Sequence, residues 1–166
     1  MRILISYICY LLFSFFIQFN NNTYSYIDSS RYNFRLNIPS INLDAAIFEY
    51  GSKNNDVNKG LYLAKKYDFN TFKGSVIIAS HSGSSPISFF KNLDLLKIHD
   101  IVIISKGDYD YYYEVHDFYR INKTGKFKYK NGDKLIYLIT CDKNNKKKQL
   151  VYMGKLEKIV KKSTFF

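Results

Sequence analysis

Short apolar or alternating runs, separated by polar turn sequences, make up most of the chain after residue 33. The clearest alternation is Phe34-Arg35-Leu36-Asn37-Ile38, which ends at Pro39. The runs share a high content of β-branched and aromatic residues, and they cover residues 34–38, 43–48, 75–79, 101–104, 111–115, 134–139 and 149–153. Turn sequences such as Lys106-Gly107-Asp108 bound them, so we predict a strand for each run.

One segment has helical spacing instead. After Pro86, a residue type favoured at the first position of a helix, the apolar residues Phe89, Phe90, Leu93 and Leu96 recur at intervals of a helical turn. We therefore expect a short helix within Ile87 to Leu96. No internal repeat is present. Seven or more short strands with one or two helical turns predict a mostly β fold, a closed or nearly closed β-barrel.

The N-terminal residues read as a targeting segment. Residues 3–19 form an uncharged segment. This segment is longer than an ordinary signal-peptide core and near the lower length limit for a membrane-spanning helix. No small-x-small cleavage site follows in residues 20–25, which favours an uncleaved signal anchor over a cleaved peptide. A buried helix is the other alternative, but a segment that is apolar on all sides suits lipid better. Arg2 places the N-terminus in the cytoplasm and the rest of the chain outside. We expect an anchor at 1–19, a polar linker at 20–33 and one domain at 34–160.

The net charge of +11 permits an anionic envelope polymer, a lipid surface or a nucleic acid as partner. The lysines are scattered rather than gathered with arginines on one motif, and the signal anchor argues against a nucleic-acid binder. Lysine-rich composition alone, typical of an AT-rich genome, accounts for such a surface. The one dense run, Lys146-Lys147-Lys148, is most simply a solvated loop.

Two residues have the chemistry of a nucleophile and its partner. The chain has two cysteines, and Cys9 lies in the apolar N-terminal segment, so Cys141 stands alone in the folded domain. Cys141 ends one apolar run beside a charged loop, and His81 follows another and opens the loop Ser82-Gly83-Ser84-Ser85. Because a thiolate needs a base or cation nearby, these strand ends predict a Cys–His pair, with an inert thiol as the alternative.

Four segments, in this order and spacing, resemble the sortase family over residues Phe34 to Leu156. Residues 35–43 resemble its opening I-P-x-I strand pair, and residues 77–81 resemble a strand that ends in Gly-His, here Ser80-His81. Residues 88–100 are similar to its FxxLxxLxxGD segment, with His99 at the glycine. Residues 137–141 resemble the TLxTC signature, with Tyr137 replacing the first Thr.

The resemblance implies a sortase-like eight-stranded β-barrel and a cysteine transpeptidase that attacks the Thr–Gly bond of an LPxTG-like sorting signal. Cys141 would be the nucleophile, and His81 the general acid and then base. The implied partners are secreted proteins with a C-terminal sorting signal and an amine acceptor, either a peptidoglycan precursor or a pilin lysine. The implied location is the outer face of the plasma membrane, with the anchor as a single pass and no nucleic acid involved.

The chain departs from the family at one catalytic position. Sortases carry an arginine on the strand after the cysteine loop, but no arginine follows Arg120 here. Alignment on the apolar run 150–153 puts Gln149 in that place, with Lys148 beside it. Gln149 brings two donors without charge, Lys148 brings charge without the planar fork, and Arg120 is the weaker substitute. A weakened enzyme or a non-catalytic binding module therefore stays open, as does an envelope cysteine endopeptidase.

We expect the pocket to be lined by residues of both strand ends, with Thr140 aiming the thiol: Ser80, His81, Ser82, Thr140, Cys141 and Gln149, and Lys148 at its edge. His99 is interpreted as a turn residue and His116 as a surface histidine. No cofactor is expected, because the histidines and Cys141 lack metal-ligand spacing. Some carboxylates could in principle form a calcium site, but they lack EF-hand-like spacing; they are Asp56, Asp68, Asp108, Asp110 and Asp117.

Overall fold

The computed structural model describes residues 32, 34–124, 127, 129 and 134–162. Its strands are β1 (Phe34–Ile38), β2 (Leu43–Ala46), β3 (Tyr62–Leu63), β4 (Ser75–Ala79), β5 (Ile101–Lys106), β6 (Tyr109–Asn122), β7 (Leu135–Cys141) and β8 (Lys148–Lys161). Two 3-10 helices, η2 (Pro39–Ile41) and η3 (Leu93–Leu95), interrupt them. The predicted mostly β architecture is confirmed, and β3 is a strand that the apolar pattern did not indicate.

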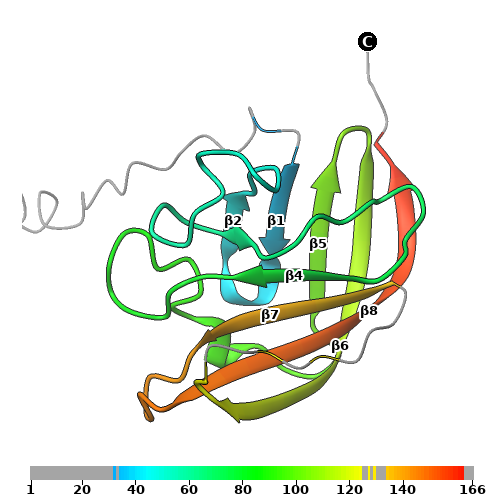
Figure 1. The fold of residues 1–166 in the computed structure, drawn as a ribbon. Coiled ribbons are helices and arrows are strands. Elements are labelled where there is room, and N and C mark those ends of the chain that lie inside the picture. The colour runs from blue at the N-terminus through cyan, green and yellow to red at the C-terminus, as the bar shows by residue number, and fades with distance from the viewer. Residues whose placement is uncertain (1–31, 33, 125–126, 128, 130–133, 163–166) are drawn as a thin grey trace, which may run out of the picture.

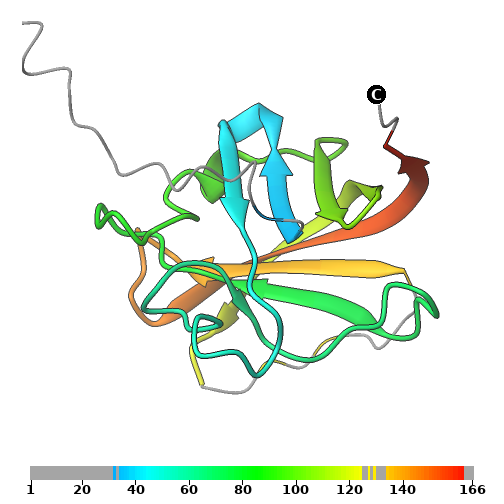
Figure 2. The same cartoon turned by 90° about the horizontal axis from the view of Figure 1, so that it is seen from above.

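The strands form one eight-stranded sheet with the order β2-β1-β5-β6-β8-β7-β4-β3. All neighbours pair antiparallel except β4 and β7, which are parallel. Since β2 and β3 end the order as edge strands, the sheet is a curled half-barrel, more open than the closed or nearly closed barrel that the sequence predicts. The long strands β6 and β8 run through both halves of the curl, and β1, β2 and β5 lie across β4 and β7 (Figures 1 and 2).

The curl has a local cause in the pairing of β6 with β8. Its register shifts between Tyr112 and Tyr113 and again between Val115 and Asp117. Such bulges bend a strand and increase its twist, which lets one sheet fold back over its own core. Gly154 of β8 lies at this crowded point, where an added Cβ would meet the Glu114 carbonyl oxygen at 3.0 Å.

The main core lies inside the curl, where side chains such as Leu36, Ile78, Tyr113 and Leu138 are almost completely buried. A smaller apolar cluster covers the opposite face of the sheet and consists of Ile77, Tyr137, Ile139 and Val151. Both faces of β4 and β7 are therefore buried, as expected of a parallel pair, and this explains their unbroken apolar sequence. We call the side of the sheet with the smaller cluster the outer face.

The helix predicted within Ile87 to Leu96 is wrong except for η3. Several amide groups there donate to carbonyls three residues back, as in Lys91 to Ser88 and Leu96 to Leu93, so the segment is a series of tight turns. The Phe90 amide leaves this series and donates to the His81 carbonyl at 3.1 Å. Phe90, Leu93 and Leu96 are buried as the helical spacing predicts, but through turns that follow the sheet rather than through an α-helix.

None of the helices within the described residues has the length and hydropathy needed to span a bilayer. The predicted anchor at 1–19 lies outside the described residues, and of the linker at 20–33 only Tyr32 is among them.

Candidate functional site

The parallel pairing of β4 and β7 brings the two predicted catalytic residues to adjacent strand ends. Ala79, the last residue of β4, is opposite Ile139 in the register; β7 continues two residues further, to Cys141, and His81 lies two residues past the end of β4. The Ser80 amide donates to the Ile139 carbonyl at 3.2 Å, so the ladder extends one residue past β4. Adjacent strands lie about 4.8 Å apart, which suits a side-chain pair at these ends.

A buried hydrogen bond ties the two strand ends together. Thr140 Oγ1 donates to the Ser80 carbonyl at 2.8 Å, and Thr140 is 3 % exposed. The Ser80 hydroxyl is engaged within the protein, with the carbonyls of Gly60 at 3.2 Å and Ile87 at 3.4 Å. Ser80 and Thr140 thus fix the backbone that precedes His81 and Cys141. Both catalytic candidates remain half-buried, and Ser82 is buried next to His81.

Gln149 lies directly opposite Cys141 in the antiparallel β7–β8 pair. Residues opposite each other in such a pair point to the same face, so Gln149 shares the outer face with Cys141. Lys148 precedes it in β8, and strand alternation turns its side chain to the other face. Of the two candidates for the missing arginine's place, the register therefore favours Gln149.

Arg120 lies on the side of β6 away from the thiol and is held by Asp142. Its Nε donates to Asp142 Oδ2 at 2.9 Å, and its guanidinium lies 5.1 Å from the centre of the Phe118 ring. Asp142 is 5 % exposed, and its other carboxylate oxygen accepts the Asn144 amide at 2.9 Å. That backbone hydrogen bond, together with the one from Arg120, lowers the pKa of Asp142 below its ordinary value.

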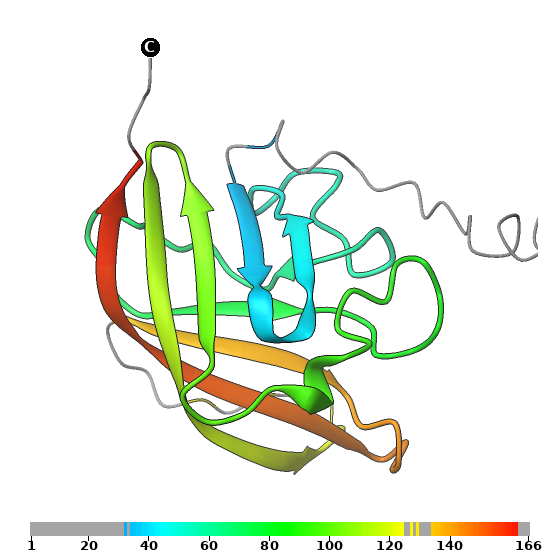
Figure 3. The same cartoon turned by 180° about the vertical axis from the view of Figure 1, so that it is seen from behind.

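A second contact fixes the loop that follows Cys141. Lys143 Nζ donates to Asp94 Oδ1 at 2.9 Å, which joins the β7–β8 loop to η3 (Figure 3). Asp142 and Lys143, the two residues after Cys141, are therefore each held by an ion pair. The backbone is thus held on either side of Cys141, by the Thr140 hydrogen bond before it and by these two ion pairs after it.

One functional candidate was not found from the sequence. Lys123 follows the last residue of β6, and its Nζ lies 3.4 Å from Cys141 Sγ, a hydrogen bond from the ammonium to the sulfur. In the sequence Lys123 is 18 residues before Cys141 and stands beside a turn, so no motif singles it out. Only the pairing of β6 with β8 and of β8 with β7 brings it to the thiol.

The other histidines lie away from this site. His99 has a backbone φ of 72°, and its ring is hydrogen-bonded to Glu114, which lowers the pKa of that carboxyl. His116 is exposed, with its Nε2 3.5 Å from Glu157 Oε1. Both agree with the interpretation of His99 as a turn residue and His116 as a surface residue. In the part of the chain that the structure describes, no group of three or more acidic, histidine or cysteine side chains is placed to hold a metal ion.

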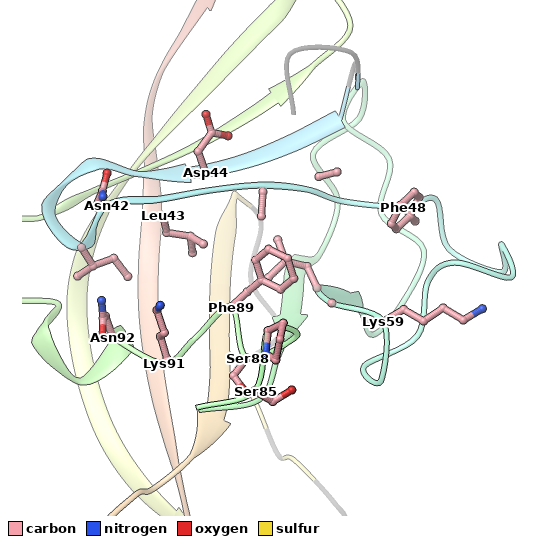
Figure 4. A pocket seen from close by; sticks show the side chains of 16 residues that line it. Asn42, Leu43, Asp44, Phe48, Lys59, Ser85, Ser88, Phe89, Lys91 and Asn92 are labelled. Atoms are coloured by element: carbon pink, nitrogen blue, oxygen red, sulfur yellow. The ribbon is translucent and has the colours of Figure 1, made fainter. Parts of the chain in front are cut away.

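A cavity of about 270 Å³ lies elsewhere, between β2 and the segment 85–92. Figure 4 shows Phe89 reaching toward β2 there, and this ring packs 3.1 Å from where a Cβ of Gly60 would stand. The cavity wall includes neither His81 nor Cys141, so it is separate from the thiol. Ser80 links the cavity to the two strand ends, because its hydroxyl donates to the Gly60 carbonyl in the wall.

Comparison with known structures identifies the same fold in several sortases. Sortase A of Listeria monocytogenes superposes with a TM-score of 0.67 at 24% identity, over 80% of this chain and 92% of that one. Sortase C-3 of Streptococcus pneumoniae gives 0.66 at 22% identity, over 79% and 65%. The sortase D5 transpeptidase of Clostridium perfringens gives 0.63 at 20% identity, over 75% and 78%.

The comparison with curated proteins finds no match. A family model, described as the sortase domain, matches residues 36–157. This range includes every strand of the sheet except parts of β1 and β8, and it contains His81, Cys141 and Gln149. Since the match covers well over half of the chain, the protein belongs to the sortase family.

Proposed function

We propose that the chain is a cysteine transpeptidase that cleaves an LPxTG-like sorting signal and joins the acyl part to an amine. The observation that carries the proposal is the placement of His81 and Cys141 at equivalent ends of two parallel strands, tied by the bond from Thr140 to Ser80. Sortases are generally cysteine transpeptidases, and the fold of this chain is theirs. The roles below are part of the proposal.

In the first step the Cys141 sulfur bonds to the carbonyl carbon of the scissile amide. The C–N bond then breaks, and the amine leaves with a proton that His81 supplies. The product is a thioester on Cys141. In the second step an incoming amine attacks that thioester, His81 takes its proton, and the C–S bond breaks to release a new amide and the Cys141 thiolate, beside the protonated His81 with which the cycle begins. No cofactor or net redox change is needed.

Gln149 has the position to orient the substrate. It lies on the outer face, opposite Cys141, and its amide group has two N–H donors for a carbonyl or oxyanion. Thr140 and Ser80 act as positioning residues, because their hydroxyls are bonded to backbone carbonyls. Ser82 borders the site beside His81, and Lys148 adds positive charge at its edge, with its side chain on the opposite face of the sheet.

The proposed substrates are secreted proteins with a C-terminal sorting signal, and the acceptor is a peptidoglycan precursor or a pilin lysine. The location that we propose is the plasma membrane, with residues 1–19 as a single-pass anchor and the folded domain outside. The uncharged run in residues 3–19 and Arg2 before it support this orientation.

A second candidate is a sortase-like module that binds sorting signals without cleaving them. The neutral side chain of Gln149 opposite the thiol favours it, because an amide donor brings no positive charge to the oxyanion, whereas a guanidinium does. An endopeptidase that passes the thioester to water is a third candidate. The two enzymes differ in whether the product depends on an added amine.

The test uses the full-length chain in mild detergent with a panel of fluorogenic LPxTG-like peptides, with and without an amine acceptor. Cys141→Ala and His81→Gln are the matched inactive variants. We expect cleavage that both variants abolish and a product that contains the added amine. Hydrolysis without amine incorporation would favour the endopeptidase. Binding of a peptide by Cys141→Ala and wild type alike, with no cleavage by either, would favour the binding module.

A further inference from the structure

Lys123 gives the candidate site a positive charge that no motif in the sequence indicates. We propose that Lys123 is a catalytic residue, whose ammonium stabilises the Cys141 thiolate and the oxyanion that forms when the thiolate attacks. The inference rests on the proposed function for its second half, the oxyanion. Its first half, the contact with the thiolate, concerns Cys141 alone.

Three strands place this ammonium. Ile121 of β6 is opposite Gln149 of β8, and Gln149 is opposite Cys141 of β7. The Lys123 amide donates to the Lys147 carbonyl at 2.8 Å, which continues the β6–β8 ladder past Asn122. By strand alternation Lys123 shares the outer face with Ile121, and its side chain extends across Gln149's strand to within 3.4 Å of Cys141 Sγ.

The neighbouring cations are engaged elsewhere. Arg120 is bonded to Asp142 on the opposite face, and Lys143 is bonded to Asp94. Lys148 alternates with Gln149 and so faces away from the thiol. Among the described residues, Lys123 is the cation with a hydrogen bond to the sulfur.

The 3.4 Å distance from Lys123 Nζ to Cys141 Sγ suits both negative charges of the reaction, first the thiolate and then the oxyanion. A thiolate is favoured over the thiol by a cation within about 4–6 Å. When the sulfur bonds to the substrate carbonyl carbon, negative charge moves to an oxygen on that same carbon. That oxygen is only two bonds from Sγ, so one of the three ammonium N–H donors can follow the charge with a small movement of the lysine side chain.

Lys123 and Gln149 then divide between them what one arginine supplies in a single side chain. Lys123 provides the charge, and Gln149 provides neutral N–H donors on a fixed strand position. Because Lys123 is exposed, dissolved ions screen its charge. The effect of Lys123 on the thiol is therefore expected to weaken as salt is added.

The test follows alkylation of Cys141 by iodoacetamide, a neutral reagent, in the full-length chain. Mass spectrometry of the peptide that contains Cys141 separates it from Cys9. The variant is Lys123→Met, the conservative rescue is Lys123→Arg, and the matched control is Lys146→Met, which removes the same charge from an exposed position on the β7–β8 loop. Thermal melts check that each variant is folded.

We expect Lys123→Met to alkylate about three- to tenfold more slowly than wild type at neutral pH and low salt, with its pH profile moved to higher pH. Lys123→Arg and Lys146→Met should remain within about twofold, and the difference between wild type and Lys123→Met should shrink at 1 M salt. Equal alkylation rates for wild type and Lys123→Met would overturn the inference. If Lys123→Met does not fold, the comparison passes to Lys123→Gln and to the salt dependence of wild type against Lys123→Arg.

Peptide cleavage separates this inference from the proposed function. If wild type cleaves a peptide, Lys123→Met should lose about tenfold or more in kcat/KM, mainly through kcat. If no peptide is cleaved but Lys123→Met still slows alkylation, the proposed function fails while the thiolate contact stands. If peptides are cleaved and both rates are unaffected by Lys123→Met, the proposed function stands and the role of Lys123 fails.

Discussion

The Thr140 hydroxyl donates to the Ser80 carbonyl at 2.8 Å, so the residue before the candidate nucleophile holds the residue before the candidate acid–base histidine. Neither side chain takes part in bond-making. Their bond fixes how far apart the two strand ends are, and because Thr140 is 3 % exposed, water does not compete for it. Substitution of Thr140 therefore tests how the two strand ends are positioned, without removing a group that reacts.

We expect Thr140→Val, which keeps the side-chain shape without the hydroxyl, to lose about 1–3 kcal/mol of unfolding free energy and at least about tenfold in kcat. Urea denaturation and steady-state peptide cleavage measure the two. Thr140→Ser, which retains the donor, is the matched control and should stay near wild type. A Thr140→Val variant with normal kcat would show that this bond does not position the pair.

Gln149 offers the reverse test, a gain of activity. Gln149→Arg places a charged planar fork opposite Cys141, and we expect kcat/KM on LPxTG-like peptides to rise by several-fold to about tenfold. Gln149→Lys brings the charge without the fork and should gain less, and Gln149→Leu should lose activity. If Gln149→Arg is slower than wild type, Gln149 does not occupy the place of the family's arginine.

Asp142 predicts a pH dependence of stability. Its pKa is lowered in the folded state from an ordinary value of 3.8, first by the Asn144 amide and then by Arg120. A lowered pKa means that ionised Asp142 stabilises the fold fully above about pH 4 and loses this effect as the pH falls through the folded value. We therefore expect Asp142→Asn to melt lower than wild type at pH 6, with the difference shrinking below pH 4.

Thermal melts between pH 2.5 and pH 7 check this prediction. Asp108→Asn, a change at an exposed position in the β5–β6 turn, is the control and should follow wild type throughout. A constant difference between Asp142→Asn and wild type across the whole range would contradict the assignment to the carboxylate charge.

Gly154 tests the crowded point where β8 crosses between β6 and β7. A Cβ there would stand 2.9 Å from Ile136 Cγ2 and 3.0 Å from the Glu114 carbonyl oxygen, and the second contact is with backbone that cannot move aside. We expect Gly154→Ala to cost about 1–3 kcal/mol in urea unfolding. Gly83→Ala, whose Cβ would meet only the Ser88 hydroxyl at 3.5 Å, should change little. Equal stabilities would show that the strands relax around the methyl group.

Local sequence predicts the strands well where their residues follow a regular burial pattern, either alternating or continuous. The apolar residues of β4 and β7 are buried on both faces, which is why their runs are unbroken and easily found. The same reasoning fails between Pro86 and Leu96, because helical spacing indicates only which residues are buried. There the Phe90 amide bonds to the distant His81 carbonyl, a tertiary contact that local spacing does not contain.

The candidate site divides in the same way. His81 and Cys141 were predicted because each lies at the end of an apolar run, and Gln149 was predicted from the resemblance to sortases; the strand registers bring the three positions to neighbouring strands. Lys123 was missed, since its position at the thiol depends on the registers of two strand pairs at once. At His99, which the resemblance aligns with a glycine, the backbone has a φ of 72°, a left-handed conformation that glycine adopts more readily than other residues.

The parallel pairing of β4 with β7 has a consequence for how the molecule folds. Ser80 and Thr140 are 60 residues apart in sequence, so the neighbourhood of His81 and Cys141 forms only after one of the larger loops of the domain has closed. Contacts of this separation are slow to form compared with hairpins such as β1–β2. A chain in which β7 has not yet paired with β4 cannot hold the Cys141 thiol beside His81. The reactivity of Cys141 in a refolding experiment should therefore rise late, after most of the antiparallel sheet has formed.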